Sequence, residues 1–107
     1  MTEAEAEAVP GSRTVRQVVL QGELDPVGAP RAGRELARAL GSGATTVVVH
    51  LNDVTFIDST GLRTLLAASD AADRRGIDLR ILPGTLEVMA VVEAASLAGR
   101  LPFVGWP

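Results

Sequence analysis

The sequence predicts a single α/β domain in which short hydrophobic strands alternate with amphipathic helices. Three observations support this prediction. Apolar residues make up 47% of the 107 residues and aromatic ones only 3%, so the core is expected to be aliphatic and closely packed. The spacing of apolar residues changes repeatedly between period two and period 3.6. Gly and Pro clusters separate the segments. Alternation of this kind favours a parallel sheet with right-handed crossovers.

The N-terminal third contains one clear strand and one clear helix. Residues 1–12 include TEAEAEAV, whose alternating glutamates fit an acidic tail or a first edge strand. Residues 14–22, TVRQVVLQG, alternate as a strand does and end at glycine. A helix is expected to start near Pro26 and to stop at the GSG of 41–43. Its apolar residues recur at helical spacing: Ala29, Ala32, Leu36, Ala39 and Leu40.

The rest of the chain repeats the same alternation. Residues 45–51, TTVVVHL, are β-branched and almost uninterrupted in hydrophobicity, which is typical of a central strand covered on both faces. A helix follows from residue 59 or 60 to the DRRG stop. A further strand is predicted at 77–82 and a further helix at 85–95. The chain closes with LPFVGWP, in which we expect Trp106 to pack against the domain.

Composition and charge exclude several classes of function. The net charge is −3, and the ten basic residues are all arginines without a run, so no basic stripe for nucleic acid is present. The absence of lysine excludes P-loop, Schiff-base and kinase lysines. The absence of cysteine excludes disulfides and thiolate metal sites. No signal peptide or membrane span is apparent. We therefore expect a soluble cytoplasmic protein without cofactor or metal.

The stretch TFIDSTGL, residues 55–62, is the candidate site. Asp58, Ser59 and Thr60 follow the predicted central strand, at the sheet edge where open α/β folds commonly bind their ligands. The peptide N–H groups of a helix start would favour an anion there. All three side chains are also good N-caps, so a purely structural role is an alternative.

Two details argue against helix capping as the full explanation. A capping box is absent, because Leu62 and Arg63 stand where Glu or Gln would be needed. Gly61 in the first turn also lowers helix stability by roughly 1 kcal/mol relative to alanine. The missing side chain of Gly61 would give a partner room to approach the Ser59 hydroxyl.

Three segments resemble the STAS domain of bacterial anti-sigma-factor antagonists: GELD at 22–25, VVVHLNDVTFIDSTGLRTLLAA at 47–68, and RGIDLRIL at 75–82. The resemblance covers about residues 14–104, and its most specific part is the D-S-T-G-L element. It implies a STAS domain over residues 13–107. That fold would be a small mixed sheet of about four or five strands packed with three or four helices.

The resemblance also implies a function and a set of site residues. Ser59 would be phosphorylated by an anti-sigma factor with serine kinase activity, with Thr60 as a less favoured acceptor. The unphosphorylated form would bind that anti-sigma factor and so free a sigma factor. A serine/threonine-type phosphatase would reverse the modification. The partner-binding residues would be Asp25, Asp58, Ser59, Thr60, Gly61, Leu62 and Arg63.

Each of these positions also has an ordinary structural interpretation. Asp25 could cap a helix before Pro26, Asp58 could form a cap or an Asx turn, and Leu62 could be part of the core. The sequence also departs from the family in the segment PVGAPRAGREL and at His50.

Two other functions remain as alternatives. One is a STAS scaffold without a switch, as a subunit of a transport system or of a sensory assembly. The other is a serine hydrolase using Ser59, His50 and an aspartate, which is disfavoured because no G-x-S-x-G motif is present. Monomer and weak dimer are both compatible with the sequence.

Overall fold

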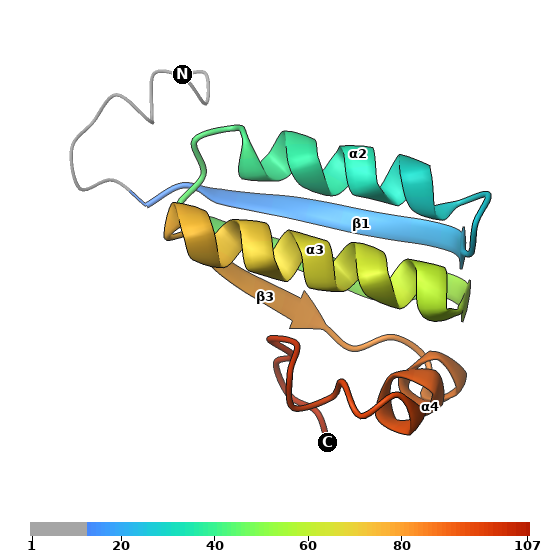
Figure 1. The fold of residues 1–107 in the computed structure, drawn as a ribbon. Coiled ribbons are helices and arrows are strands. Elements are labelled where there is room, and N and C mark those ends of the chain that lie inside the picture. The colour runs from blue at the N-terminus through green and yellow to red at the C-terminus, as the bar shows by residue number, and fades with distance from the viewer. Residues whose placement is uncertain (1–12) are drawn as a thin grey trace.

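The computed structural model describes residues 13–107 as one layer of strands with helices packed against it (Figure 1). The expected acidic tail or edge strand at residues 1–12 lies outside the described residues. The elements, in chain order, are β1 (Val15–Leu24), α2 (Ala29–Leu40), β2 (Thr46–Ile57), α3 (Ser59–Arg75), β3 (Asp78–Leu82) and α4 (Leu86–Ala94). The predicted alternation of strands and helices is confirmed.

The sheet has the order β1-β2-β3, and both pairings are parallel. It is smaller than predicted: the described residues form three strands instead of four or five, and the sheet is parallel instead of mixed. The C-terminal segment adds only an isolated bridge between Ile81 and Phe103. Two residues near Phe103 limit the pairing of the C-terminal segment to this one bridge. Pro102 has no N–H to donate, and Gly105 turns the backbone at φ 76°.

Strands β1 and β2 run beyond their predicted ends, to Leu24 and Ile57 instead of Gly22 and Leu51. The polar pair Asn52 and Asp53 breaks the apolar pattern but stays within β2, where both residues are exposed. The pairing of β1 with β2 continues past this point through two register shifts. The longer β2 carries the chain directly into α3.

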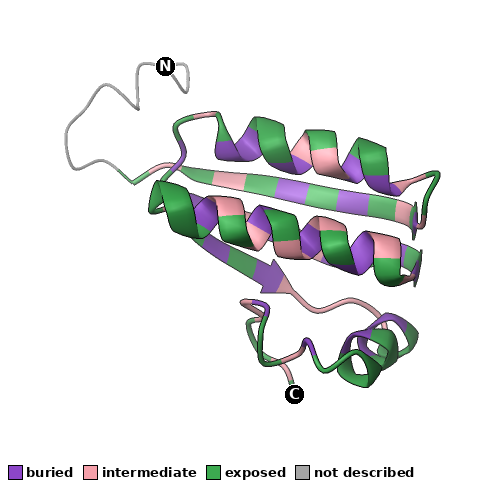
Figure 2. Cartoon of the chain, in the orientation of Figure 1, coloured by how far each residue is buried: buried purple, intermediate pink, exposed green. Residues whose placement is uncertain are grey.

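The buried face of the sheet follows from the register. Val18, Val49 and Ile81 are partners across the three strands and are all buried. The opposite face is open on β1, where Val15 and Val19 are about half exposed. Buried and exposed residues alternate along β1 in Figure 2. The prediction that residues 45–51 are covered on both faces is therefore wrong in part, because Val48 and His50 are only half-buried.

Helices α2 and α3 pack side by side against the sheet, and α4 lies beside β2 beyond the end of β3 (Figure 1). The five apolar residues that recur at helical spacing in α2 are its five buried residues. After α4, residues 102–104 run along β3 through hydrogen bonds with Ile81. Trp106 is half-buried against the core, and its indole Nε1 donates to Glu93 Oε1 at 2.8 Å. The expected packing of Trp106 is confirmed.

Candidate functional site

The Asp58 side chain fixes the junction between β2 and α3. Its backbone is extended, and Oδ1 accepts hydrogen bonds from Thr60 N at 2.9 Å and from Gly61 N at 3.3 Å. The Asp58 carbonyl accepts from Leu62 N at 3.0 Å. Asp58 is therefore the N-cap, one of the two structural roles considered for it. The N–H groups that were expected to favour an anion are partly occupied, because Asp58 Oδ1 already accepts those of Thr60 and Gly61.

Ser59 is the first residue of α3, and its side chain is exposed. No other residue within 13–107 forms a hydrogen bond or ion pair with the Ser59 hydroxyl. The hydroxyl is thus open to an approaching protein, which the phosphorylation hypothesis requires. A cap could not present its oxygen in this way, because a capping oxygen is held by backbone N–H groups.

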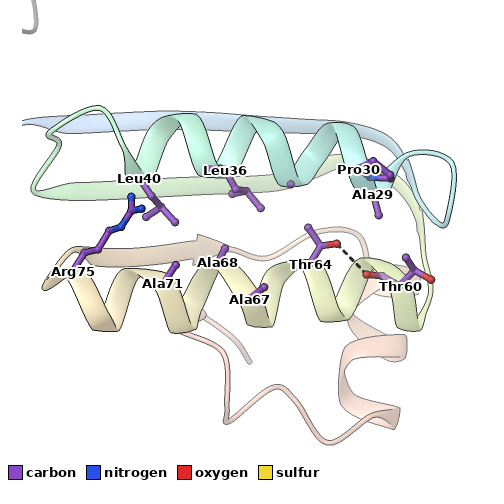
Figure 3. A pocket seen from close by; sticks show the side chains of 12 residues that line it. Ala29, Pro30, Leu36, Leu40, Thr60, Thr64, Ala67, Ala68, Ala71 and Arg75 are labelled. Atoms are coloured by element: carbon purple, nitrogen blue, oxygen red, sulfur yellow. Dashed lines mark hydrogen bonds between the residues drawn. The ribbon is translucent and has the colours of Figure 1, made fainter.

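The side chain of Thr60 faces a groove, whereas that of Ser59 is exposed to solvent. Thr60 is half-buried, and its side chain lines the groove between α2 and α3 (Figure 3). The Thr60 carbonyl accepts a hydrogen bond from Thr64 Oγ1 at 3.1 Å. The capping role considered for Thr60 is wrong, because Asp58 provides the cap. The lower exposure of Thr60 agrees with its lower rank as a phosphate acceptor.

Gly61 is buried, and the explanation given for it from sequence is wrong. A Cβ at this position would lie 2.4 Å from Leu24 O, 2.6 Å from Leu24 Cβ and 2.8 Å from Ile57 Cγ1. The missing side chain therefore admits the ends of β1 and β2, and it leaves no room for a partner. Leu62 is also in the core, at 5% exposure. Of the residues from 61 to 63, only Arg63 offers an exposed side chain.

Asp25 forms a second capped turn beside the first. Its Oδ1 accepts from Val27 N at 3.0 Å and from Gly28 N at 2.8 Å. Helix α2 begins at Ala29 after this turn, three residues later than the predicted start at Pro26. Asp25 is thus not the N-cap expected before Pro26.

The sheet register brings Asp25 close to Ser59. Leu24 and Ile57 are partners across β1 and β2, and Asp58 N donates to Leu24 O at 3.3 Å. Asp25 and Asp58 therefore follow neighbouring strand ends, which lie about 4.8 Å apart. Three of the predicted site residues thus lie at the same edge of the sheet: Asp25, Asp58 and Ser59.

Two exposed apolar residues at the same edge were missed by the sequence analysis. Val27 is 87% exposed in the turn after Asp25, and Phe56 is 49% exposed two residues before Asp58. The exposure of Val27 could have been predicted, because this apolar residue stands between Pro26 and Gly28, two residues that are typical of an exposed turn. We call Val27 and Phe56, together with Ser59, the serine edge. Apolar groups beside a polar target are common at the centres of protein interfaces.

His50 is too far from Ser59 to act on it. It lies in β2 seven residues before Ile57, which corresponds to about 23 Å along a strand. Its Nε2 interacts instead with Gln17 Oε1 on the open sheet face. The geometry therefore contradicts a Ser59–His50 nucleophile and base pair.

The ion pair between Arg80 and Asp78 lies away from the serine edge, because these residues pair with Thr46 and Val48 near the start of β2. The pKa of Arg80 is raised by its hydrogen bond to Asp78 and by the charge of that carboxylate, and this exposed pair belongs to β3. Residues 13–107 contain no group of three or more His, Asp or Glu side chains able to hold a metal ion. The described part of the chain has no helix both long enough and apolar enough to cross a bilayer.

The fold and the site define a small α/β domain that presents an exposed serine where its central strand meets a helix. The STAS domain model matches residues 6–104, so the chain belongs to the STAS domain family. The match starts before residue 13, within the segment assigned as tail or edge strand. No curated protein matches the chain.

Two solved structures are similar to this fold. The anti-sigma factor antagonist SpoIIAA in its unphosphorylated form has a TM-score of 0.69 and 18% identity, over 90% of this chain and 83% of the other. The STAS domain of a SulP transporter from Vibrio cholerae has a TM-score of 0.65 and 20% identity, over 94% and 84%. At these identities the likeness shows the fold alone.

Proposed function

We propose that the protein is an anti-sigma factor antagonist that switches partners through Ser59. In this proposal the unphosphorylated domain binds an anti-sigma factor with serine kinase activity, and phosphorylation of Ser59 releases it. A serine/threonine-type phosphatase restores the binding form. The proposal rests on one observation, the exposed Ser59 hydroxyl at the start of α3 beside Asp25 and Asp58. The SpoIIAA-like fold supports it.

The capped helix start explains why phosphorylation would act on the complex and not on the domain. A phosphoserine adds about −1.5 to −2 charges and three acceptor oxygens, which a helix N-terminus tolerates. Asp58 already holds the N–H groups of Thr60 and Gly61. The phosphate therefore cannot fold back onto these donors, so it projects from the surface at Ser59.

A projecting phosphate would weaken docking strongly. It would stand beside Asp58 and near Asp25, where a docked partner excludes water and charge repulsion is least screened. A penalty of about 3 to 4 kcal/mol would reduce affinity by a few hundredfold. This change is sufficient to reverse the occupancy of the complex. The domain itself performs no catalysis in this proposal, acts in the cytoplasm and needs no cofactor.

The test compares substitutions at Ser59 with one at Ser96. Calorimetry with the cognate anti-sigma factor should show that Ser59→Ala binds like the unphosphorylated protein, even after incubation with ATP. Ser59→Asp should bind at least tenfold more weakly while keeping the circular dichroism of the wild type. Ser96→Asp is the matched control, because Ser96 is exposed and lies after α4. Equal binding of Ser59→Ala and Ser59→Asp would contradict the switch.

A second candidate is a STAS scaffold that does not switch, in a transport system or a sensory assembly. The similarity to the STAS domain of a SulP transporter favours it. The two candidates differ in one observable. Under partner switching, incubation with the anti-sigma kinase and ATP should add one phosphate to the intact mass, and Ser59→Ala should prevent it. An unmodified chain that stays bound to its assembly would favour the scaffold.

A further inference from the structure

Helices α2 and α3 enclose a groove of about 410 Å³ (Figure 3). Leu36, Leu40 and Ala68 line it with buried side chains, and Gly33, Ala37, Ala67 and Ala71 keep it open because they are small. The groove extends from Thr60 near one end of α3 to Arg75 at the other. Fifteen residues of helix separate these two, a length of about 22 Å.

The dimensions of the groove fit a hydrocarbon chain better than a helix. Its volume spread over this length leaves a width of about 5 Å for the centres of water-sized atoms, so the groove itself is about 8 Å across. One extended hydrocarbon chain needs about 4 Å, the contact distance between carbon atoms. A helix with its side chains is about 10 Å across and would rest on the rims.

Charge distinguishes the two ends of the groove. Arg75 is the single charged residue among those that line it. Within residues 13–107 its guanidinium has no hydrogen bond or ion pair, although it reaches across toward Gly41 at the end of α2. Both helices end here with partly negative carbonyls, and Arg38 and Arg74 in their last turns offset that charge. An anionic head group would thus be favoured beside Arg75.

We propose that this groove binds a long-chain carboxylate, with its hydrocarbon chain between α2 and α3 and its carboxylate on Arg75. A carboxylate can accept two parallel hydrogen bonds from one guanidinium, which places the head group at the Arg75 end of the groove. The chain then runs over the alanines toward Thr64 and Thr60. The inference does not depend on the phosphorylation of Ser59.

Palmitate is a suitable probe, used below the concentration at which it aggregates. Displacement of a fluorescent fatty acid from the 107-residue chain should show one palmitate per chain. Hexadecanol, which has the same chain length and no charge, should bind at least tenfold more weakly, because a hydrogen bond to a charged group is lost. Laurate should lose about twofold or more for each methylene removed, as expected for a chain that is partly buried.

Two substitutions separate the head-group contact from the chain contact. Arg75→Gln should lower palmitate affinity at least tenfold and abolish the preference over hexadecanol. Arg74→Gln removes only a charge that offsets the helix end, so it should lower the affinity less than threefold and keep the preference. Ala67→Phe fills the groove from an exposed position and should abolish binding, while Ala90→Phe on α4 should leave it unchanged. If Ala67→Phe does not fold, Ala37→Phe fills the groove from the α2 side.

Three results would overturn the proposal. The first is the absence of palmitate binding to the wild type. In that case sedimentation should be measured, and self-association that Ala67→Phe abolishes would indicate that a second copy of the chain occupies the groove. The second is binding that persists in folded Ala67→Phe and Ala37→Phe. The third is an equal effect of Arg74→Gln and Arg75→Gln, because it would indicate general attraction of an anion to the arginines.

Discussion

Residues 25–28 and 58–61 are two versions of the same turn, with the sequences D-P-V-G and D-S-T-G. In each, the aspartate Oδ1 accepts the N–H groups two and three residues later. In each, a Cβ on the final glycine would overlap a backbone oxygen, Glu23 O at 1.9 Å or Leu24 O at 2.4 Å. The shared geometry of the two turns thus lies in their first and last residues.

The two turns differ in their middle residues and in their relation to the next helix. Pro26 and Val27 stand in a turn that precedes α2, whereas Ser59 and Thr60 already belong to the first turn of α3. The first turn therefore presents an apolar side chain, and the second presents a free hydroxyl. Aspartate and glycine thus build the scaffold at this edge, and the residues between them determine which side chains a partner contacts.

The largest effect is expected at Gly61. Gly61→Ala should lower the free energy of unfolding by about 3 kcal/mol, because the added Cβ overlaps backbone and side-chain atoms between a helix and two strands. Gly28→Ala should lower it by about 2 kcal/mol, because its Cβ would overlap one group, the Glu23 carbonyl at 1.9 Å, in a half-buried turn. Urea denaturation measures both.

Gly33→Ala is the matched control for these variants. Its Cβ would meet only Thr64 Cγ2, at an ordinary 3.8 Å, and the residue lies within α2. Alanine there should stabilise the protein by about 0.5 to 1 kcal/mol. A Gly61→Ala protein as stable as the wild type would refute the structural role assigned to this glycine.

A smaller loss is expected when either aspartate is removed. Asp58→Ala should destabilise by about 1.5 kcal/mol, because Gly61 N is buried and loses its acceptor. Asp25→Ala should destabilise by about 1 kcal/mol, because water can reach the exposed Val27 N. Thermal unfolding checks the order. Asp58→Asn keeps the acceptor and should stay near wild-type stability, so a loss as large as that of Asp58→Ala would show that charge, not capping, dominates.

The smallest effect on stability is expected at the tip of the first turn. Val27→Ser should change the free energy of unfolding by less than about 0.5 kcal/mol, because the side chain is 87% exposed. Under the proposed function it should weaken binding to the anti-sigma factor about fivefold, the loss of about 1 kcal/mol of apolar contact. Unchanged affinity would remove Val27 from the serine edge.

Regular packing was predictable from the sequence, whereas contacts between distant segments were not. The helical spacing of Ala29, Ala32 and Leu36 matches the face of α2 that is buried in the structure, so this face could be identified from the sequence. The end of β2 was missed because Asn52 and Asp53 interrupt the apolar pattern, although a strand can continue with exposed polar residues. A periodicity argument detects burial and cannot detect backbone pairing.

The candidate site divides in the same way. The placement of Asp58 and Ser59 beyond a strand end follows from chain order alone. The role of Gly61 depends on Leu24 and Ile57, which only the register of β1 and β2 brings together. A glycine carries no side-chain signal of such a contact. From the sequence, Gly61 was expected to leave room for a partner, whereas in the structure it leaves room for Leu24 and Ile57.

The hydrogen bond between Trp106 and Glu93 gives the molecule its own optical reporter. The chain has one tryptophan and no tyrosine, so indole emission comes from a single place. That place joins the C-terminal segment to α4, whereas Ser59 opens α3. If a substitution or phosphorylation at Ser59 changes the fluorescence of Trp106, the start of α3 and the C-terminal segment are conformationally coupled. If the fluorescence stays constant, the two regions respond independently.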